Sequence, residues 1–401
     1  MDKRTLGGLM RATQLTRAGR LAEATALIQR SLTGGPTGPV SRNPTSAGSG
    51  LANAVVIEGE CSEVVAPAHR EQSERGVRAA GSVTTRIGLE QAIRTWRRGH
   101  VDDESRVAAK AHNQQPGDWI AGAFENAAGH RAYRLYVPST YAGQPLPLIV
   151  MLHGCNQTPE DFAAGTQMNA LGEARSCFVL YPAQSHVANP SRCWNWFRRE
   201  DQDRDAGEPS IIAGMTREIV SRYGIDSRKV YVAGLSAGGA MAAVMGVTYA
   251  DLYAAVGIHS GLACGSAHDL PSALAAMKGM PTSFRSPADV AGASHSIPTI
   301  VFHGDRDTTV HPRNGVDAIS RSAHREGGLG GQVLTESGQA PDGHAYTRTI
   351  HRDAVGRVVL EHWLVHGGGH AWFGGSRAGS YSDPRGPCAA GEMLRFFLQI
   401  A

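Results

Sequence analysis

Short apolar runs separated by amphipathic segments predict alternating strands and helices along most of the chain. The runs at 146–152, 229–233, 297–302 and 357–365 are rich in branched and aromatic residues and have the length of buried strands. Helices are predicted at 159–168 and at 210–223, and the second places Ile211, Met215, Ile219 and Tyr223 on one side. Residues 121–124 and 131–138 predict an edge hairpin leading into the sheet. This alternation is typical of an α/β fold with a mostly parallel sheet and helices on both faces.

The front of the chain has a different composition. Residues 13–32 have a helical period, and residues 33–50 contain almost no large apolar side chain. We therefore expect an N-terminal amphipathic helix within 1–34, a disordered linker over 35–115 and one catalytic α/β domain over 116–401. A surface helix is the simplest interpretation of the first segment; docking, partner binding and membrane contact are the alternatives.

A glycine-flanked serine marks the first candidate catalytic residue. Gly234-Leu235-Ser236-Ala237-Gly238 fits G-x-S-x-G, with a predicted strand before it and a small, apolar, helix-compatible segment after it. A serine on such a turn is the nucleophile elbow of α/β-hydrolases. The alternative is a glycine-rich turn whose serine only caps the helix.

A serine nucleophile needs a base and an orienting acid, and both candidates follow it in the order expected for this fold. The strand at 297–302 leads into His303-Gly304-Asp305-Arg306-Asp307, where Asp305 and Asp307 are both candidates for the acid. The strand at 357–365 leads into a glycine loop, where His370 is the predicted base and His366 its rival.

Three histidines of this region allow a metal site as an alternative. His362, His366 and His370 are spaced four residues apart and would share one face of a helix. Gly367–Gly369 would break that helix, however, and the residues around His362 are strand-like. We therefore expect no metal and no organic cofactor.

The oxyanion hole is predicted after the strand at 146–152, in His153-Gly154-Cys155. The backbone amides of Cys155 and Ala237 are the candidate donors to a tetrahedral oxyanion. The alternative is a simple strand-to-helix turn.

Several stretches together resemble the poly(3-hydroxybutyrate) (PHB) depolymerase-type esterases, a branch of the α/β-hydrolases related to feruloyl and acetylxylan esterases. They lie within about 116–399 and include VMLHGCNQTPEDF, RCWNWF, YVAGLSAGGAMA, VFHGDRDTTV and HWLVHGGGHAWFGG. The resemblance implies a triad of Ser236, Asp307 and His370 that hydrolyses esters through an acyl-enzyme, with poly- or oligo(3-hydroxybutyrate)-like esters as substrates. A feruloyl or acetylxylan esterase, a serine peptidase or an acyltransferase on the same fold remains an alternative, as does a non-catalytic binding protein.

Side chains near these segments are candidates for substrate contact, although packing is an equal alternative for each tryptophan. They are Trp194, Asn195, Trp196 and Trp372.

Charge, cysteines and the N-terminus bear on partners and location. A formal net charge of +3 on 401 residues is too small to indicate nucleic-acid binding. Of six cysteines, Cys155 with Cys193 and Cys264 with Cys388 are candidate disulfides, with buried thiols as the alternative.

No transmembrane run or signal peptide is visible. The resemblance implies an extracellular enzyme, with a cytoplasmic one as the alternative. The sequence gives no oligomeric state.

Overall fold

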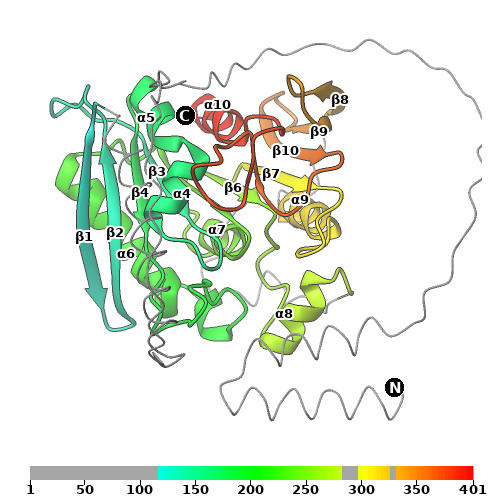
Figure 1. Cartoon of the computed structure of the whole chain (residues 1–401). Helices are drawn as coiled ribbons and strands as arrows, with labels where there is room; N and C mark the ends of the chain where they lie inside the picture. The colour runs from blue at the N-terminus through cyan, green and yellow to red at the C-terminus, as the bar shows by residue number, and fades with distance from the viewer. Residues whose placement is uncertain (1–115, 282–296, 326–330, 401) are drawn as a thin grey trace, which may run out of the picture. The chain divides into compact units, whose positions relative to one another are not determined.

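The computed structural model describes residues 116–281, 297–325 and 331–400. Within them, the chain forms a ten-stranded sheet in the order β1-β2-β4-β3-β5-β6-β7-β10-β9-β8 (Figure 1). The helix predicted within 1–34 and the linker predicted over 35–115 lie outside the described residues.

The six central strands are parallel and almost wholly buried, and the apolar runs predicted four of them, all but those at 178–182 and 255–259. The six are β3 (Leu148–Leu152), β4 (Phe178–Pro182), β5 (Val230–Leu235), β6 (Ala255–His259), β7 (Thr299–Gly304) and β10 (Val358–Val365). Their parallel pairing brings the carboxyl ends of β3, β5, β7 and β10 to one edge of the sheet. Ligand-binding groups gather at this edge in open α/β sheets.

An antiparallel hairpin borders the parallel strands on each side. The predicted hairpin forms from β1 (Asp118–Asn126) and β2 (Gly129–Val137), and β2 pairs with β4. The second hairpin, β8 (Val333–Gln339) and β9 (Ala345–Arg352), pairs with β10 and was not predicted.

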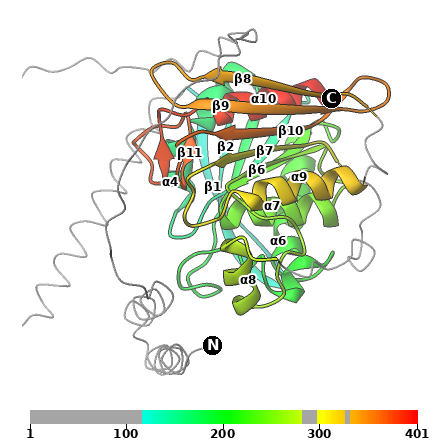
Figure 2. The ribbon, with the colours of Figure 1, turned by 90° about the vertical axis from the view of Figure 1, so that its right-hand side faces the viewer.

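Helices cover both faces of the sheet, and the core is correspondingly divided into two clusters (Figures 1 and 2). Helices α6 (Gly207–Tyr223), α7 (Ala237–Thr248) and α9 (Arg313–Arg325) contribute to one cluster, together with the short α8 (Leu270–Met277). Helices α4 (Pro159–Thr166), α5 (Met168–Ala174) and α10 (Ala389–Ile400) contribute to the other. The prediction of a mostly parallel sheet with helices on both faces is confirmed.

The smaller elements are a 3-10 turn, η1 (Arg199–Gln202), and the two-stranded pair β11 (Trp372–Phe373) and β12 (Ser382–Asp383). In α6, the predicted apolar side is the buried one: Ile211, Met215 and Ile219 are fully covered and Tyr223 is half-buried. No helix within the described ranges is long and apolar enough to cross a bilayer.

Candidate active site

Ser236 occupies a strained turn between β5 and α7. Its backbone angles are φ 56° and ψ −117°, outside the conformations that a non-glycine residue ordinarily adopts. Its side chain makes no capping hydrogen bond to α7, although it stands at the N-cap position. Helix capping therefore does not explain the serine at this position. The packing around the turn must maintain its strained backbone conformation.

The glycines on either side of Ser236 are required by close backbone packing. A Cβ at Gly238 would lie 2.0 Å from the carbonyl oxygen of Leu152, and one at Gly234 would lie 2.4 Å from the backbone of Gly238. Real side chains do not tolerate such distances, so the turn needs glycine at both positions.

Asp307 is buried in the loop after β7. Its Oδ1 accepts hydrogen bonds from the amides of Thr309 and Val310, both at 2.8 Å. Burial raises the pKa of Asp307, but hydrogen bonds from His303 and His370 outweigh that effect and hold the pKa well below its usual range. The carboxylate is therefore ionised at neutral pH.

His370 pairs with Asp307. Its Nδ1 lies 2.6 Å from Asp307 Oδ2, and only 13% of its side chain is exposed. Because the carboxylate accepts the Nδ1 hydrogen, Nε2 is the nitrogen left to take a proton. Neither His370 Nε2 nor the Ser236 hydroxyl has a hydrogen-bond partner within the part of the chain that the structure describes. In proteins without substrate, such contacts are often long and tighten on binding.

The two rival residues pair with each other. Asp305 Oδ2 lies 3.1 Å from His366 Nδ1, and Asp305 Oδ1 accepts from the amide of Gly367 at 2.7 Å. His366 Nε2 is 2.9 Å from the hydroxyl of Thr347 on β9, so both ring nitrogens have partners. This second pair fastens the glycine loop that carries His370 to the loop that carries Asp307.

The candidate oxyanion loop lies against Ser236. A Cβ built on Gly154 would be 3.6 Å from Ser236 Cβ. The Gly154 amide donates to Gln157 Oε1 at 2.9 Å, while the Gly154 carbonyl accepts from His153 Nδ1 at 2.8 Å. Fixing that carbonyl fixes the opposite N–H of the same peptide, which belongs to Cys155.

Both candidate oxyanion donors are available. The amides of Cys155 and Ala237 donate to no protein acceptor among residues 116–281, 297–325 and 331–400. Ala237 opens α7, where amides lack a helical partner and the helix dipole favours negative charge. Both amides thus remain free to donate to a bound group.

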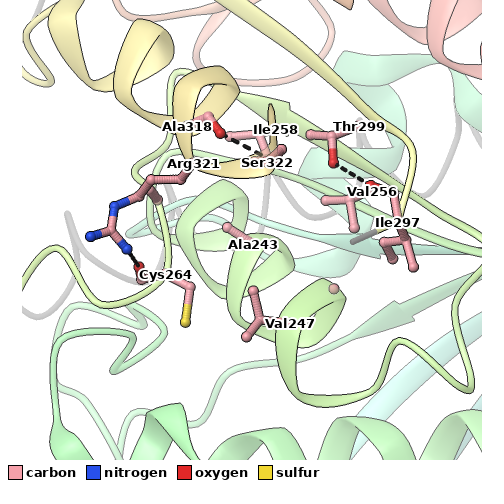
Figure 3. A pocket seen from close by; sticks show the side chains of 12 residues that line it. Ala243, Val247, Val256, Ile258, Cys264, Ile297, Thr299, Ala318, Arg321 and Ser322 are labelled. Carbon is pink, nitrogen blue, oxygen red and sulfur yellow. Dashed lines mark hydrogen bonds between the residues drawn. The ribbon is translucent and has the colours of Figure 1, made fainter. Parts of the chain in front are cut away.

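Cys155 and Cys193 form the predicted disulfide, with Cα atoms 4.2 Å apart. The predicted Cys264–Cys388 disulfide is wrong. Cys388 is disulfide-bonded elsewhere, whereas Cys264 keeps a buried thiol. Cys264 lines a small cavity of about 40 Å³ beside α7 and α9, and its carbonyl accepts from Arg321 Nη1 at 3.2 Å (Figure 3). Pairing could not be chosen from the sequence, because it depends on which loops meet in space.

The candidate substrate-contact residues are buried. Trp194, Trp196 and Trp372 are 0%, 6% and 1% exposed, and all three belong to the core clusters. Asn195, 2% exposed, donates its amide and its side-chain NH₂ to Glu208, each at 2.7 Å. Their burial favours packing, the alternative weighed for the tryptophans, over contact with a ligand.

Several residues that hold the site in place were missed by sequence reasoning. His303 Nε2 lies 2.8 Å from the Val310 carbonyl and 3.5 Å from Asp307 Oδ2. His153 is buried, and burial lowers its pKa to about 4, so its ring is neutral. Both histidines stand directly before a glycine at the end of a central strand. That repeated H-G pair was the available signal.

The helical three-histidine site that was weighed as an alternative does not form, because His362 lies within strand β10. No group of three or more metal-ligating side chains that could hold an ion occurs among the described residues.

A mostly parallel sheet, a strained serine between strand and helix, and an Asp–His pair from later strands define the class of α/β-hydrolases. The acetyl xylan esterase from Aspergillus awamori has the same fold, with a TM-score of 0.55 at 21% identity over 70% of this chain and 99% of that one. A family model described as esterase PHB depolymerase matches residues 131–338, just over half of the chain. The chain therefore belongs to the PHB depolymerase family of esterases, which confirms the family resemblance.

Two curated relatives differ in the substrate that they are named for. Poly(3-hydroxyalkanoate) depolymerase C from Paucimonas lemoignei is 32% identical over 250 residues, which are 59% of this chain and 57% of the depolymerase. Acetylxylan esterase A from Talaromyces purpureogenus is 28% identical over 302 residues, 70% of this chain and 75% of the esterase. The chain thus spans less than two thirds of the length of the depolymerase.

Proposed function

We propose that this chain is a serine esterase that works through a Ser236–His370–Asp307 triad and an acyl-enzyme. The strained Ser236, which makes no capping bond and lies beside two unpaired backbone amides, is the observation that carries the proposal. The paired His370 and Asp307 supply the expected base and orienting acid.

In this mechanism, Ser236 Oγ attacks the ester carbonyl carbon while His370 Nε2 accepts the hydroxyl proton. The amides of Cys155 and Ala237 donate to the oxyanion, a contribution of about 3–4 kcal/mol per donor in related chemistry. His370 then protonates the departing alcohol. Water, deprotonated by the same nitrogen, releases the acid from Ser236. Asp307 holds the Nδ1–H tautomer and stabilises the imidazolium throughout.

For the substrate, we propose poly- or oligo(3-hydroxybutyrate)-like esters, supported by the family match and by the name of the Paucimonas relative. The Talaromyces relative supports an acetylxylan esterase as the second candidate. The serine peptidase and acyltransferase alternatives use the same triad and differ only in the acyl acceptor or leaving group.

We also propose that the protein works in an oxidising compartment, in agreement with the expected extracellular location. The Cys155–Cys193 disulfide is the support, because structural disulfides are rare in reducing compartments.

The test compares wild type with Ser236→Ala on p-nitrophenyl butyrate, hydroxybutyrate oligomers, solid polyhydroxybutyrate, methyl ferulate and acetylated xylan. Serine-dependent release of acid from the hydroxybutyrate substrates supports the full proposal. Activity confined to feruloyl or acetyl esters would indicate that the substrates are esters of plant polysaccharides rather than hydroxybutyrate esters. Full activity of Ser236→Ala on any of them contradicts the mechanism.

A further inference from the structure

A cavity of about 340 Å³ is lined in part by His153 and Gln157, which flank the candidate oxyanion loop. This volume is at the lower end of small-molecule sites, about 300–1,000 Å³. Its walls come from β1, β2, the ends of β3 and β4, and the start of α4. The polar lining includes Arg134, His153, Gln157, Glu160, Gln184 and Arg192.

One lining residue, Gln157, is bonded to the loop that lies against the candidate nucleophile. Its side chain accepts a hydrogen bond from the amide of Gly154 at 2.9 Å. The Cα of Gly154 faces Ser236 so closely that an added Cβ would be 3.6 Å from the serine Cβ. The loop beside Ser236 and the cavity wall thus share a hydrogen-bonded contact, which is where an extended substrate would pass from one to the other.

Among the residues that line the cavity, Arg192 carries the one charge without an ion-pair partner, while Asp161, which accepts from Gln157 Nε2 at 3.0 Å, is a carboxylate close by. Arg134 Nε is neutralised by Glu160 Oε1 at 2.6 Å. His153 is neutral because burial lowers its pKa to about 4. Arg192 forms no ion pair with any residue in the described ranges, and its charge also lowers the pKa of His153. An anion is therefore favoured at the Arg192 end of the lining, away from Glu160 and Asp161 on α4.

The backbone around Arg192 is tied to the oxyanion loop on both sides. The carbonyl of Ser191 accepts from the amide of Asn156 at 2.7 Å, and Cys193 is bridged to Cys155. Arg192 itself has a left-handed φ of 50°, uncommon for a residue other than glycine, and its amide donates to the Asn189 carbonyl at 2.8 Å. Arg192 is thus a half-buried arginine whose backbone is fixed beside the candidate oxyanion loop and whose guanidinium pairs with no carboxylate in the described ranges.

We propose that Arg192 binds a carboxylate carried by the ester substrate, so that the enzyme prefers acidic esters over neutral ones. A guanidinium matches the two oxygens of a carboxylate in planar, bidentate geometry. The free acid end of a short hydroxyalkanoate oligomer is the source that fits the proposed function, on which this inference rests. A uronate side group on an acetylated xylan is the other source of the same chemistry.

The test measures a selectivity ratio: kcat/KM for the 3-hydroxybutyrate trimer as free acid, divided by kcat/KM for its methyl ester. A second pair consists of acetylated xylo-oligosaccharides with and without a glucuronate side group. Wild type is expected to prefer the acidic member of at least one pair by about tenfold, and Arg192→Gln to bring that ratio close to one. Arg192→Lys is expected to give an intermediate ratio, because lysine keeps the positive charge but cannot bind both carboxylate oxygens in planar, bidentate geometry.

Arg228→Gln is the matched control, because it removes the same charge from an exposed site at the amino end of β5, where Arg228 pairs with Asp226. Its ratio should equal that of wild type. Circular dichroism checks that each variant is folded. If Arg192→Gln is not folded, Arg192→Lys takes its place in the comparison.

A wild-type ratio near one in both pairs overturns the inference, as does a ratio that survives Arg192→Gln. Preference only in the glucuronate pair supports the carboxylate site and contradicts the hydroxybutyrate substrate. Absence of Ser236-dependent p-nitrophenyl butyrate hydrolysis contradicts the proposed function itself.

Discussion

Two aspartates in one short loop have different partners. Asp307 is fully buried and bonded to His370, whereas Asp305 has a side chain 35% exposed and bonded to His366. A buried carboxylate interacts with an imidazolium far more strongly than an exposed one, because little water screens the charges. The catalytic role therefore belongs to the buried pair in our proposal.

At the residue scale, Asp307→Asn is expected to lower kcat by about 10⁴-fold, because an amide no longer selects the Nδ1–H tautomer of His370. Asp305→Asn should cost far less, since its histidine is also held by Thr347. The measurement is the kcat of both variants on p-nitrophenyl butyrate. An equal loss, or a larger loss for Asp305→Asn, would move the acid to Asp305.

The spacing of the residues left the pairing of acid and histidine open, and the family resemblance alone favoured Asp307 with His370. Asp305 and Asp307 are two residues apart, and His366 and His370 are four apart, so spacing allows either combination. In the structure, the burial of the Asp307 carboxylate, which follows from how the loop after β7 packs, separates the two pairs. The tryptophans illustrate the same limit, because nearness in sequence does not say whether a side chain faces the cleft or the core.

At the scale of single elements, the turn between β5 and α7 depends on the absence of side chains. Gly238→Ala places a Cβ 2.0 Å from the Leu152 carbonyl oxygen, which is backbone and cannot rotate away. We expect a loss of about 1–3 kcal/mol or more in unfolding free energy, measured by chemical denaturation.

Gly369→Ala is the control for stability, because a Cβ there meets no atom within 4 Å and the backbone φ is not left-handed. It should unfold close to the wild-type midpoint. If Gly238→Ala also unfolded at the wild-type midpoint, that result would contradict the close approach of α7 to β3.

The Cys155–Cys193 disulfide joins the loop after β3 to the segment after β4. It closes a loop with a sequence separation of 38, for which a chain-entropy estimate gives at most about 4 kcal/mol of stabilisation. The double variant Cys155→Ala/Cys193→Ala should therefore melt at a lower temperature. Its kcat should fall as well, because the loop that carries the Cys155 amide then keeps the hydrogen bond from His153 to Gly154 but loses its covalent link.

Cys177→Ala supplies the comparison, since Cys177 is a buried thiol outside any disulfide. It should lose less stability than the double variant and keep a kcat close to wild type. A double variant with unchanged kcat would show that the oxyanion loop needs no such tie.

For the whole molecule, buried acids set a dependence of stability on pH. Burial, followed by the nearby charge of Glu208, raises the pKa of Asp201 to about 7 from an ordinary value of 3.8. A carboxyl whose folded-state pKa is raised binds its proton more tightly in the folded state. Its contribution to stability is therefore greatest at low pH and is lost progressively as pH rises from about 4 to about 7.

Asp201→Asn should flatten the fall in Tm between pH 5 and pH 8, because the amide stays neutral and its oxygen still accepts from the Glu208 amide. Asp342→Asn, at an exposed turn, should leave the pH profile of Tm as in wild type. Parallel profiles for wild type and Asp201→Asn would contradict the raised pKa.

The central sheet was the most predictable part of the molecule, because buried parallel strands appear as uninterrupted apolar runs. The β8–β9 hairpin was not predicted, because β8 (VLTESGQ) exposes most of its residues and lacks a hydrophobic pattern. The cavity beside Arg192 also could not be predicted, since its walls come from strands and loops far apart in the sequence.

The place of β10 in the sheet has a practical consequence for anyone who designs a fragment of this protein. The family match begins within β2 and ends in β8, at residue 338. A fragment cut at those limits would lack β9, β10, His370 and α10, and would leave β7 as an unpaired edge. The boundaries of the family-model match are thus not the boundaries of the folding unit.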